Sequence, residues 1–468
     1  MRKTKRRIEP LSFYDHTGIE KHLEKMALKG WMVERIANYG WIYRRIEPKK
    51  LRFCVSYYPK ASAFDPEPTE GQRTFFDFCA HTGWILACTS AQMQIFYNER
   101  EDPIPIETDP VIEVETIHSV SKRTFLPSQV VSLLLGLLCA FLYAPSVLHA
   151  PIDFLSSPTK LFIEVCWIML VVTSATEIIA YFRWHRRAVQ AAEQGEFMDT
   201  LSTTNLQKTV LGILFLMMFY LIVNTLVSAD AMMRFIMTAM MVYMVSLFVL
   251  VDAIRRFLKR KKTPRNVNRT VTLVMSFALS FTMMGLVTFM SLKLSSEGFF
   301  ADGRETYEHR GQTWIVYSDQ IPLRVEDMLD VEYDGYMTEN RRDSSIFLTK
   351  QEIYQRPRFD AEDYQEMPTL RYTLVTVKMP FLYDTCKNQM YDDLDETDST
   401  SIPEGHQAYL EKTDAAPWGA EAAYHVKNQS HDWDSGQYLL CYADSIVEIR
   451  FDWEVTEAHK AIVGELLG

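Results

Sequence analysis

Five long apolar stretches occupy the middle of the chain and separate two regions of mixed pattern. Each stretch extends over about 20 residues, the length of helix that crosses ~30 Å of hydrocarbon. Unpaired backbone groups are costly in lipid, so we expect these stretches to be helices. The predicted spans are 127–149, 161–182, 209–228, 231–252 and 270–293. The third and fourth are joined by a very short turn and should form a helical hairpin.

Residues 1–126 combine a helical pattern with strand patterns. Apolar residues between positions 19 and 27 recur at helical spacing, which predicts one buried helix face. Gly30 suits the left-handed conformation that often ends a helix. Trp31 then begins a strand, and two further strands are expected in NYGWIYRRIEP and LRFCVSYYP.

The same pattern appears a second time before the first span. A helix is expected from Gln72 to Thr82, it should end at Gly83, and Trp84 begins the apolar strand WILACTS, which MQIFYNE follows. We therefore expect a two-layer α+β domain built from two similar halves. Large aromatic side chains dominate core burial, so both tryptophans are interpreted as packing anchors.

The motifs of this region resemble a known family. FYDHTGIEKHLEKMALKGW, YGWIYRR, FCVSYYPK and FFDFCAHTGWILACTSAQMQIFYNE are similar to the domain-of-unknown-function 2812 family, found in membrane proteins of Firmicutes. The likeness covers roughly residues 10 to 110. It implies a bacterial membrane protein, and it brings no activity, cofactor or catalytic residue with it.

Charge is distributed unevenly along the chain and predicts its orientation in the membrane. The net charge of −11 divides into about +2 before residue 127, about +7 in 127–294 and about −20 after that. Basic clusters lie before the first span, after the second span, and between the fourth and fifth spans at Arg255–Arg269. Positive clusters stay in the cytoplasm, so the N-terminus should be cytoplasmic and the C-terminus extracytoplasmic in the cell membrane. The cluster at Arg255–Arg269 is also expected to contact anionic lipid.

Residues 294–468 are expected to form an acidic extracytoplasmic α+β domain. Strands are predicted in GQTWIVYSDQIPL, SSIFLTKQEIY and LRYTLVTVKMPF, a hairpin in QYLLCYADSIVEIRFDW, and a terminal helix capped by Thr456. Cys386 and Cys441 are the two cysteines of this domain. A disulfide between them and two free buried thiols are both compatible with the sequence.

Few residues point to chemistry. The acidic run of residues 391–400 lacks the glycine of a calcium-binding loop and is interpreted as a solvated loop. His406, His425 and His431 do not have the spacing of a helix-borne metal site. We therefore predict no metal, no cofactor, no nucleic-acid partner and no enzymatic activity.

Charged residues inside the predicted spans give one structural hypothesis. Glu164 and Arg234 have matched depth near the outer face, so a contact between them could order the bundle. Glu177 lies within about two turns of Arg183 and is expected to pair or to extend toward the inner face.

The expected architecture is therefore an α+β cytosolic domain at 1–126, a five-helix transmembrane bundle at 127–293, and an extracytoplasmic domain at 294–468. This layout favours a non-enzymatic sensor, adaptor or regulator with a cytosolic protein partner. A transporter component or small-solute permease is the alternative.

Overall fold

The computed structural model describes residues 3–37, 40–228, 231–297, 299–301, 304–331, 335–361, 366–397, 407–428 and 436–468. The chain divides into two compact units, each described separately below. Unit 1 comprises Met1–Cys139, Cys166–Ile222 and Phe235–Phe289, and unit 2 comprises Ala140–Val165, Val223–Arg234 and Met290–Gly468. Mixed helix and strand structure and five membrane-length helices are thus confirmed.

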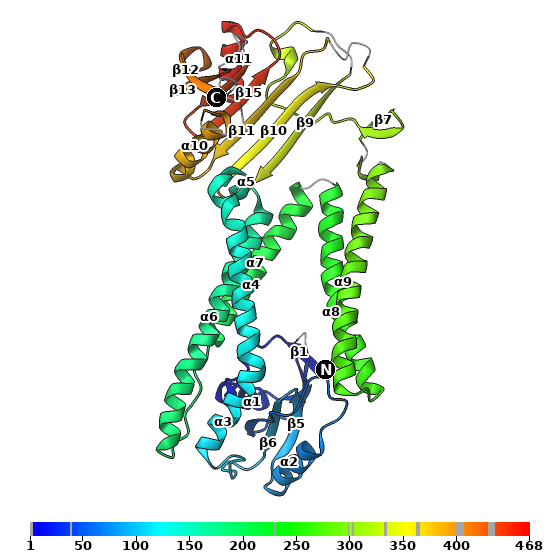
Figure 1. Ribbon diagram of the computed structural model, residues 1–468, viewed down its shortest axis with the longest axis vertical. Coiled ribbons are helices and arrows are strands. Elements are labelled where there is room, and N and C mark those ends of the chain that lie inside the picture. The colour runs from blue at the N-terminus through cyan, green and yellow to red at the C-terminus, as the bar shows by residue number, and fades with distance from the viewer. Residues whose placement is uncertain are drawn as a thin grey trace. The chain divides into compact units, whose positions relative to one another are not determined.

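The N-terminal part of unit 1 consists of two β-α-β-β halves (Figure 1). The first half contains β1 (Thr4–Arg7), α1 (His16–Leu28), β2 (Trp31–Ala37) and β3 (Gly40–Arg45). The second contains β4 (Arg52–Tyr57), α2 (Glu70–His81), β5 (Ile85–Ser90) and β6 (Met93–Asn98). Each half forms an antiparallel three-stranded sheet, in the order β1-β3-β2 and β4-β6-β5.

The two halves repeat the strand register as well as the strand order. Met32 pairs with Arg44 in the first half, and Ile85 pairs with Tyr97 in the second. The two paired residues are separated by the same number of residues along the chain in both halves. A β-bulge follows in each hairpin, between Val33 and Arg35 and between Leu86 and Cys88. The strand LRFCVSYYP belongs to the second half, because β4 pairs with β6. The expectation that it completes the first half is wrong.

Local signals explain where the two helices begin and end. Asp15 caps α1 by accepting from the backbone N–H of Gly18, and Thr69 forms a capping box with Gln72 at the start of α2. Gly30 and Gly83 follow the helices with φ of +76° and +88°, a region that only glycine enters without strain.

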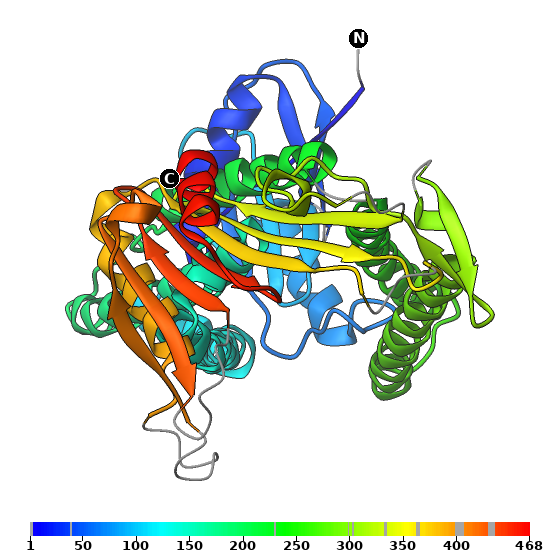
Figure 2. The same cartoon turned by 90° about the horizontal axis from the view of Figure 1, so that it is seen from above.

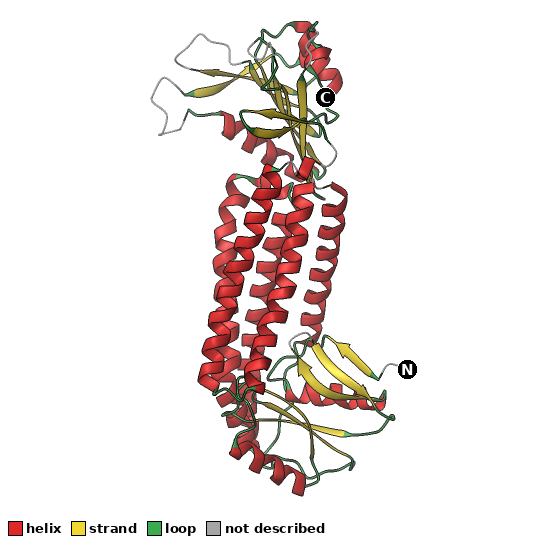
Figure 3. Cartoon of the chain, turned by 90° about the vertical axis from the view of Figure 1, so that its right-hand side faces the viewer, coloured by secondary structure: helices red, strands yellow, loops and turns green. Residues whose placement is uncertain are grey.

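Five helices in the described residues are long and apolar enough to cross a membrane, as expected (Figure 3). The first is continuous from α3 (Pro110–Val120) through the π-helical segment η1 (Ser121–Phe125) to α4 (Leu126–His149). The others are α6 (Pro158–Glu193), α7 (Thr204–Ser228), α8 (Ala231–Arg260) and α9 (Arg265–Ser296). All of them extend beyond the predicted spans, because polar residues continue the helices past the apolar windows. Each contributes residues to both units.

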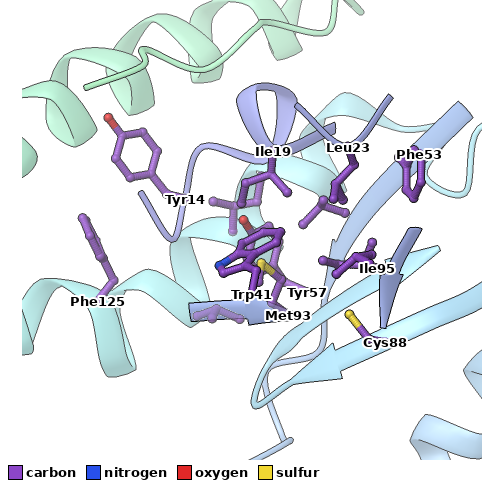
Figure 4. Close-up of a cluster of buried hydrophobic side chains, with 14 of the residues drawn as sticks. Tyr14, Ile19, Leu23, Trp41, Phe53, Tyr57, Cys88, Met93, Ile95 and Phe125 are labelled. Carbon is purple, nitrogen blue, oxygen red and sulfur yellow. The ribbon is translucent and has the colours of Figure 1, made fainter. Parts of the chain in front are cut away.

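The core of unit 1 combines the α+β halves with these helices. Figure 4 shows Tyr14, Ile19 and Leu23 beside Trp41, Tyr57 and Ile95 from the strands. Val114, Ile117, Val120 and Phe125 of the first long helix belong to the same cluster, as do Tyr181, Trp184, Ala188 and Ala192 of α6. The α+β region therefore does not bury its core within residues 1–126 alone.

Unit 2 is built on a seven-stranded antiparallel sheet, drawn from yellow to red in Figure 2. The strand order is β12-β13-β14-β15-β11-β10-β9. The strands are β9 (Tyr336–Ser344), β10 (Leu348–Pro357), β11 (Leu370–Val377), β12 (Ala408–Thr413), β13 (Ala422–Asn428), β14 (Gln437–Cys441) and β15 (Ser445–Phe451). A separate pair is formed by β7 (Thr306–His309) and β8 (Gln312–Ile315).

Helices cover both faces of this sheet. Tyr438 and Leu440 of β14 pack in one cluster with Val463 of α11 (Glu457–Leu467), which Thr456 caps. Leu439 and Cys441, on the opposite face, pack with α10 (Tyr383–Leu394) and with Ile152 of α5 (Pro151–Leu155). The remaining short 3-10 segments are Phe299–Ala301, Val325–Asp327, Pro380–Leu382 and Ala416–Trp418. The acidic run was expected to be a loop, but its first four residues are the last turn of α10; residues 398–400 lie outside the described part.

Candidate functional site

A cavity of about 230 Å³ lies in unit 1 beside the first turns of α1. Its walls come from α1, β4, the segment before α3, α3 itself, and residues 197–199 after α6. The polar side chains on its wall include His16, Glu20, Glu107, Glu113 and Asp199. The lining therefore carries four carboxylates and one imidazole, which makes the cavity acidic.

His16 and Glu113 form an ion pair across this cavity wall. His16 Nε2 lies 2.8 Å from Glu113 Oε1, and the His16 residue is 6% exposed. Burial by itself lowers the pKa of His16, but the hydrogen bond to Glu113 and the charge of Glu20 outweigh this effect and raise it. His16 Nδ1 is buried with no hydrogen-bond partner among the described residues.

Glu20 lies one helical turn after His16 on the same face of α1. Its Oε1 accepts a hydrogen bond of 2.8 Å from the backbone N–H of Val55. Burial raises the pKa of Glu20 to about 7, although His16 and the Val55 N–H act in the opposite direction. The carboxyl therefore exchanges its proton near neutral pH.

The other polar groups of the cavity differ in their environments. Burial raises the pKa of Glu107, and the nearby charges of Glu113 and Asp109 raise it further. Asp199 forms an ion pair with Lys21 of α1. Burial also raises the pKa of the Cys54 thiol well above its usual range, so the thiolate needed for nucleophilic chemistry is disfavoured. The site is suited to binding a cation or transferring a proton.

A second polar network fixes the wall that follows α6. The Asp15 carboxylate accepts from the hydroxyl of Thr200, and Thr17 and Thr200 are joined through their hydroxyls at 2.6 Å. Tyr14 donates to the carbonyl of Leu201 at 2.9 Å. Residues 199–201 are thus attached to the start of α1.

Glu177 of α6 is the centre of the adjoining network. Its carboxylate accepts hydrogen bonds from the Ser12 and Thr203 hydroxyls and from the Gln207 side-chain amide. Glu177 is 4% exposed. The expectation that it pairs with Arg183 or extends to the inner face is wrong, because these three donors satisfy it inside the protein.

Residues 15–128 match the family described as a protein of unknown function, DUF2812. The matched region is about a quarter of the chain and includes α3 and both β-α-β-β halves apart from β1. It also contains every cavity residue except those after α6. No curated protein and no solved structure gives a match to the chain.

The two tryptophans of the DUF2812 region have different environments. Trp84 is buried, and its Nε1 donates to the Ile104 carbonyl at 2.8 Å. Trp31 is half-buried, with Lys5 Nζ 5.4 Å and Arg45 Cζ 5.1 Å from its ring centroid. Gly30 and Gly83 position the strands that carry them, and none of these four residues lines the cavity.

The structure does not join Glu164 to Arg234, the contact hypothesised from their depth. The Oε2 atom of Glu164 is buried without a hydrogen-bond partner in the described residues. Cys386 and Cys441 are free thiols in one buried cluster of unit 2, so of the two alternatives the structure has the reduced one.

The basic link, Arg255–Arg269, extends from the end of α8 into the start of α9, and its charge is partly neutralised within unit 1. Asp252 pairs with Arg255 at 2.6 Å and with Arg256 at 3.0 Å. Lys262 Nζ lies 2.7 Å from Glu67 Oε1 in the segment before α2. Part of the positive charge of this link is therefore paired within unit 1.

The same link is held to the DUF2812 region by hydrogen bonds. Arg265 donates to the Lys60 carbonyl at 3.2 Å, and the fully buried Asn268 donates to the Phe64 carbonyl at 3.2 Å. The segment between β4 and α2 therefore contacts the first turns of α9.

No group of three potential metal ligands occurs among the described residues. His425 lies on β13, whereas His406 and His431 fall outside the described part of the chain. Sequence reasoning missed the cavity residues entirely. The available signal was the spacing of His16 and Glu20 on the apolar face of α1.

Proposed function

We propose that this protein is a non-enzymatic membrane regulator in which movement of α6 is transmitted to the DUF2812 region. The observation that carries the proposal is the shared aromatic core. The ring of Tyr14 lies 5.3 Å from Tyr181, 5.8 Å from Trp184 and 5.4 Å from Phe125. Interiors are close-packed, so α6 cannot shift or rotate without disturbing α1.

Within unit 2, the short helix α5, which leads into α6, packs against the acidic domain. Ile152 of α5 is buried in the core of unit 2, and its N–H donates to Gln389 of α10 at 2.8 Å. Lys350 of β10 pairs with Asp153 at 2.6 Å, and Ser345 donates to the Leu155 carbonyl at 2.5 Å. Since α6 begins at Pro158, a change in the acidic domain would act on its first turn.

The charge distribution supports an orientation for this coupling. With the basic clusters in the cytoplasm, the DUF2812 region lies inside the cell and the acidic domain lies outside. A ligand or partner that binds one conformation of either domain better than the other would then shift both.

Hydrogen exchange of the full chain in nanodiscs tests this coupling. Lys350→Glu removes the Asp153 pair, and we expect faster amide exchange at residues 12–20 and 197–203. Lys412→Glu is the matched control, because Lys412 is an exposed lysine of β12 in the same domain. Unchanged exchange at these residues in a folded Lys350→Glu variant would refute the proposal.

A further inference from the structure

We propose that the acidic cavity beside α1 binds a small organic cation, an ammonium group carried on an apolar stem. This inference deepens the proposed function. The control of coupling by the ligand rests on the proposed function, whereas the binding of the ligand does not.

The charge of the lining selects for a cation. Four carboxylates line the cavity; Glu113 is paired with His16 and Asp199 with Lys21. Glu20 and Glu107 have no cationic partner among the described residues and supply the excess negative charge. A carboxylate offers about four acceptor positions, and the structure records one hydrogen bond to Glu20, from Val55. Charge-assisted hydrogen bonds from an ammonium group would use the positions that remain.

The size and the apolar part of the lining favour an organic ligand over a metal ion. A cavity of about 230 Å³ is many times larger than the space that one water or one metal ion needs, so it has room for a small organic ligand. Val55, Ile106, Ile117 and Phe197 supply apolar surface for a stem. In addition, no three potential metal ligands are grouped in the described chain.

A buried polar atom is left without a partner at the same place. The Nδ1 atom of His16 has no hydrogen bond among the described residues, although His16 is 6% exposed and lines the cavity. When Nε2–H donates to Glu113, the neutral imidazole leaves Nδ1 as an acceptor, to which an ammonium N–H can donate. Leaving a buried acceptor unsatisfied is costly, and this bond would remove the cost.

The position of the cavity gives the ligand a consequence. Phe197 and Asp199 belong to the segment that follows α6, whereas Glu20 is on α1 and Glu113 is on α3. A bound cation would therefore bridge all three and hold this segment against α1. Occupancy would stabilise the arrangement through which α6 and the DUF2812 region are proposed to be coupled.

Calorimetric titration of the full chain in detergent at pH 8 tests the binding. The probe is 2-phenylethylammonium, and the controls are neutral 2-phenylethanol, anionic 3-phenylpropanoate and calcium chloride. We expect the ammonium compound to bind and the three controls not to bind. Binding of calcium alone, or equal binding of the neutral analogue, would overturn the proposal.

Variants locate the bound cation. Glu20→Gln and Glu113→Gln should each weaken 2-phenylethylammonium binding at least tenfold, and Thr116→Phe should block the cavity without changing its charge. Glu24→Gln is the control, because Glu24 lies one turn further along α1 and faces Arg52 at 3.4 Å. Unchanged affinity in Glu20→Gln and Thr116→Phe would place any binding elsewhere and refute the site. The Lys350→Glu exchange experiment uses no amine, so the two proposals fail independently.

Discussion

The hydroxyl of Ser12 donates to the carboxylate of Glu177, and both side chains are buried although 165 residues separate them. This bond fixes the segment before α1 to a helix of membrane length. A carboxylate buried among three donors contributes more than a neutral pair, because charged hydrogen bonds are about twice as strong.

Glu177→Ala should destabilise the protein by about 3 kcal/mol, since it leaves the Ser12, Thr203 and Gln207 donors without an acceptor. The measurement is the thermal unfolding midpoint of the purified chain in detergent. Glu193→Ala is the control, because Glu193 is exposed near the end of the same helix. Equal midpoints for the two variants would mean that the network is not stabilising.

Trp184→Ala should cost about 3–5 kcal/mol, as expected for removing a fully buried large aromatic. The loss should appear as greater protease sensitivity of residues 1–126 in the intact chain. Phe182→Ala provides the comparison, because Phe182 is 45% exposed two positions earlier on α6. If both variants retained wild-type protection, the shared core would not support the α+β region.

The stability of unit 1 should fall as the pH rises from about 5 to 8. Glu20 holds its proton more tightly when folded, with a pKa of about 7, so its contribution is complete below the usual carboxyl range and is lost above about 7. The raised pKa of His16 acts in the same direction, and Glu113 and Glu24 are the other charges nearby.

Glu20→Gln should reduce this pH dependence. As the pH rises to 8, the variant should lose less free energy of unfolding than the wild type, by an amount on the order of 3 kcal/mol. Chemical denaturation at several pH values measures it, and Glu24→Gln should keep the wild-type slope. A Glu20→Gln slope equal to that of wild type would show that the carboxyl is not buried in solution.

The free part of the basic link should select anionic lipid. The described residues give Arg260 and Lys261 no acidic partner, whereas Lys262 and Arg265 face Glu67 and Asp65. Replacing Arg260 and Lys261 with glutamine should reduce the preference of the reconstituted chain for phosphatidylglycerol over phosphatidylcholine by about 2 kcal/mol. The Lys262→Gln and Arg265→Gln double variant should lose less, and the reverse order would contradict the assignment.

The acidic domain should be outside the cell. A C-terminal alkaline phosphatase fusion is expected to be active, and an N-terminal fluorescent fusion should be bright in the cytoplasm. The orientation would be reversed if the C-terminal phosphatase fusion were inactive and a C-terminal fluorescent-protein fusion were bright.

Local patterns in the sequence were sufficient to predict the repeat and the membrane-length helices. Gly30 and Gly83 end helices through a conformation that depends on one residue, and the apolar windows depend only on composition. The pairing of strands could not be predicted in the same way. Apolar and polar residues alternate in LRFCVSYYP, and this pattern does not depend on which strand lies beside it. The assignment of β4 to the second half depends on its contact with β6.

The cavity could not be predicted for a related reason. Glu20, Glu113 and Asp199 are far apart in the sequence, and each by itself resembles an ordinary surface carboxylate. Their proximity depends on the extension of α6 beyond its apolar window and on the return of the chain to α1. Glu177 was misinterpreted because its partners lie in segments with no apolar pattern of their own.

The π-helical turn at Ser121–Phe125 sets the angular phase of the first membrane helix. A π turn takes in about one residue more than an α-helical turn, so it absorbs a residue that would rotate the rest of a continuous α-helix by roughly 100°. The five residues Ser121–Phe125 therefore advance the helix by about the same angle as four α-helical residues. Val114 and Ile117 thus keep their orientation relative to α4, and adding or removing a residue outside this turn would lose that alignment.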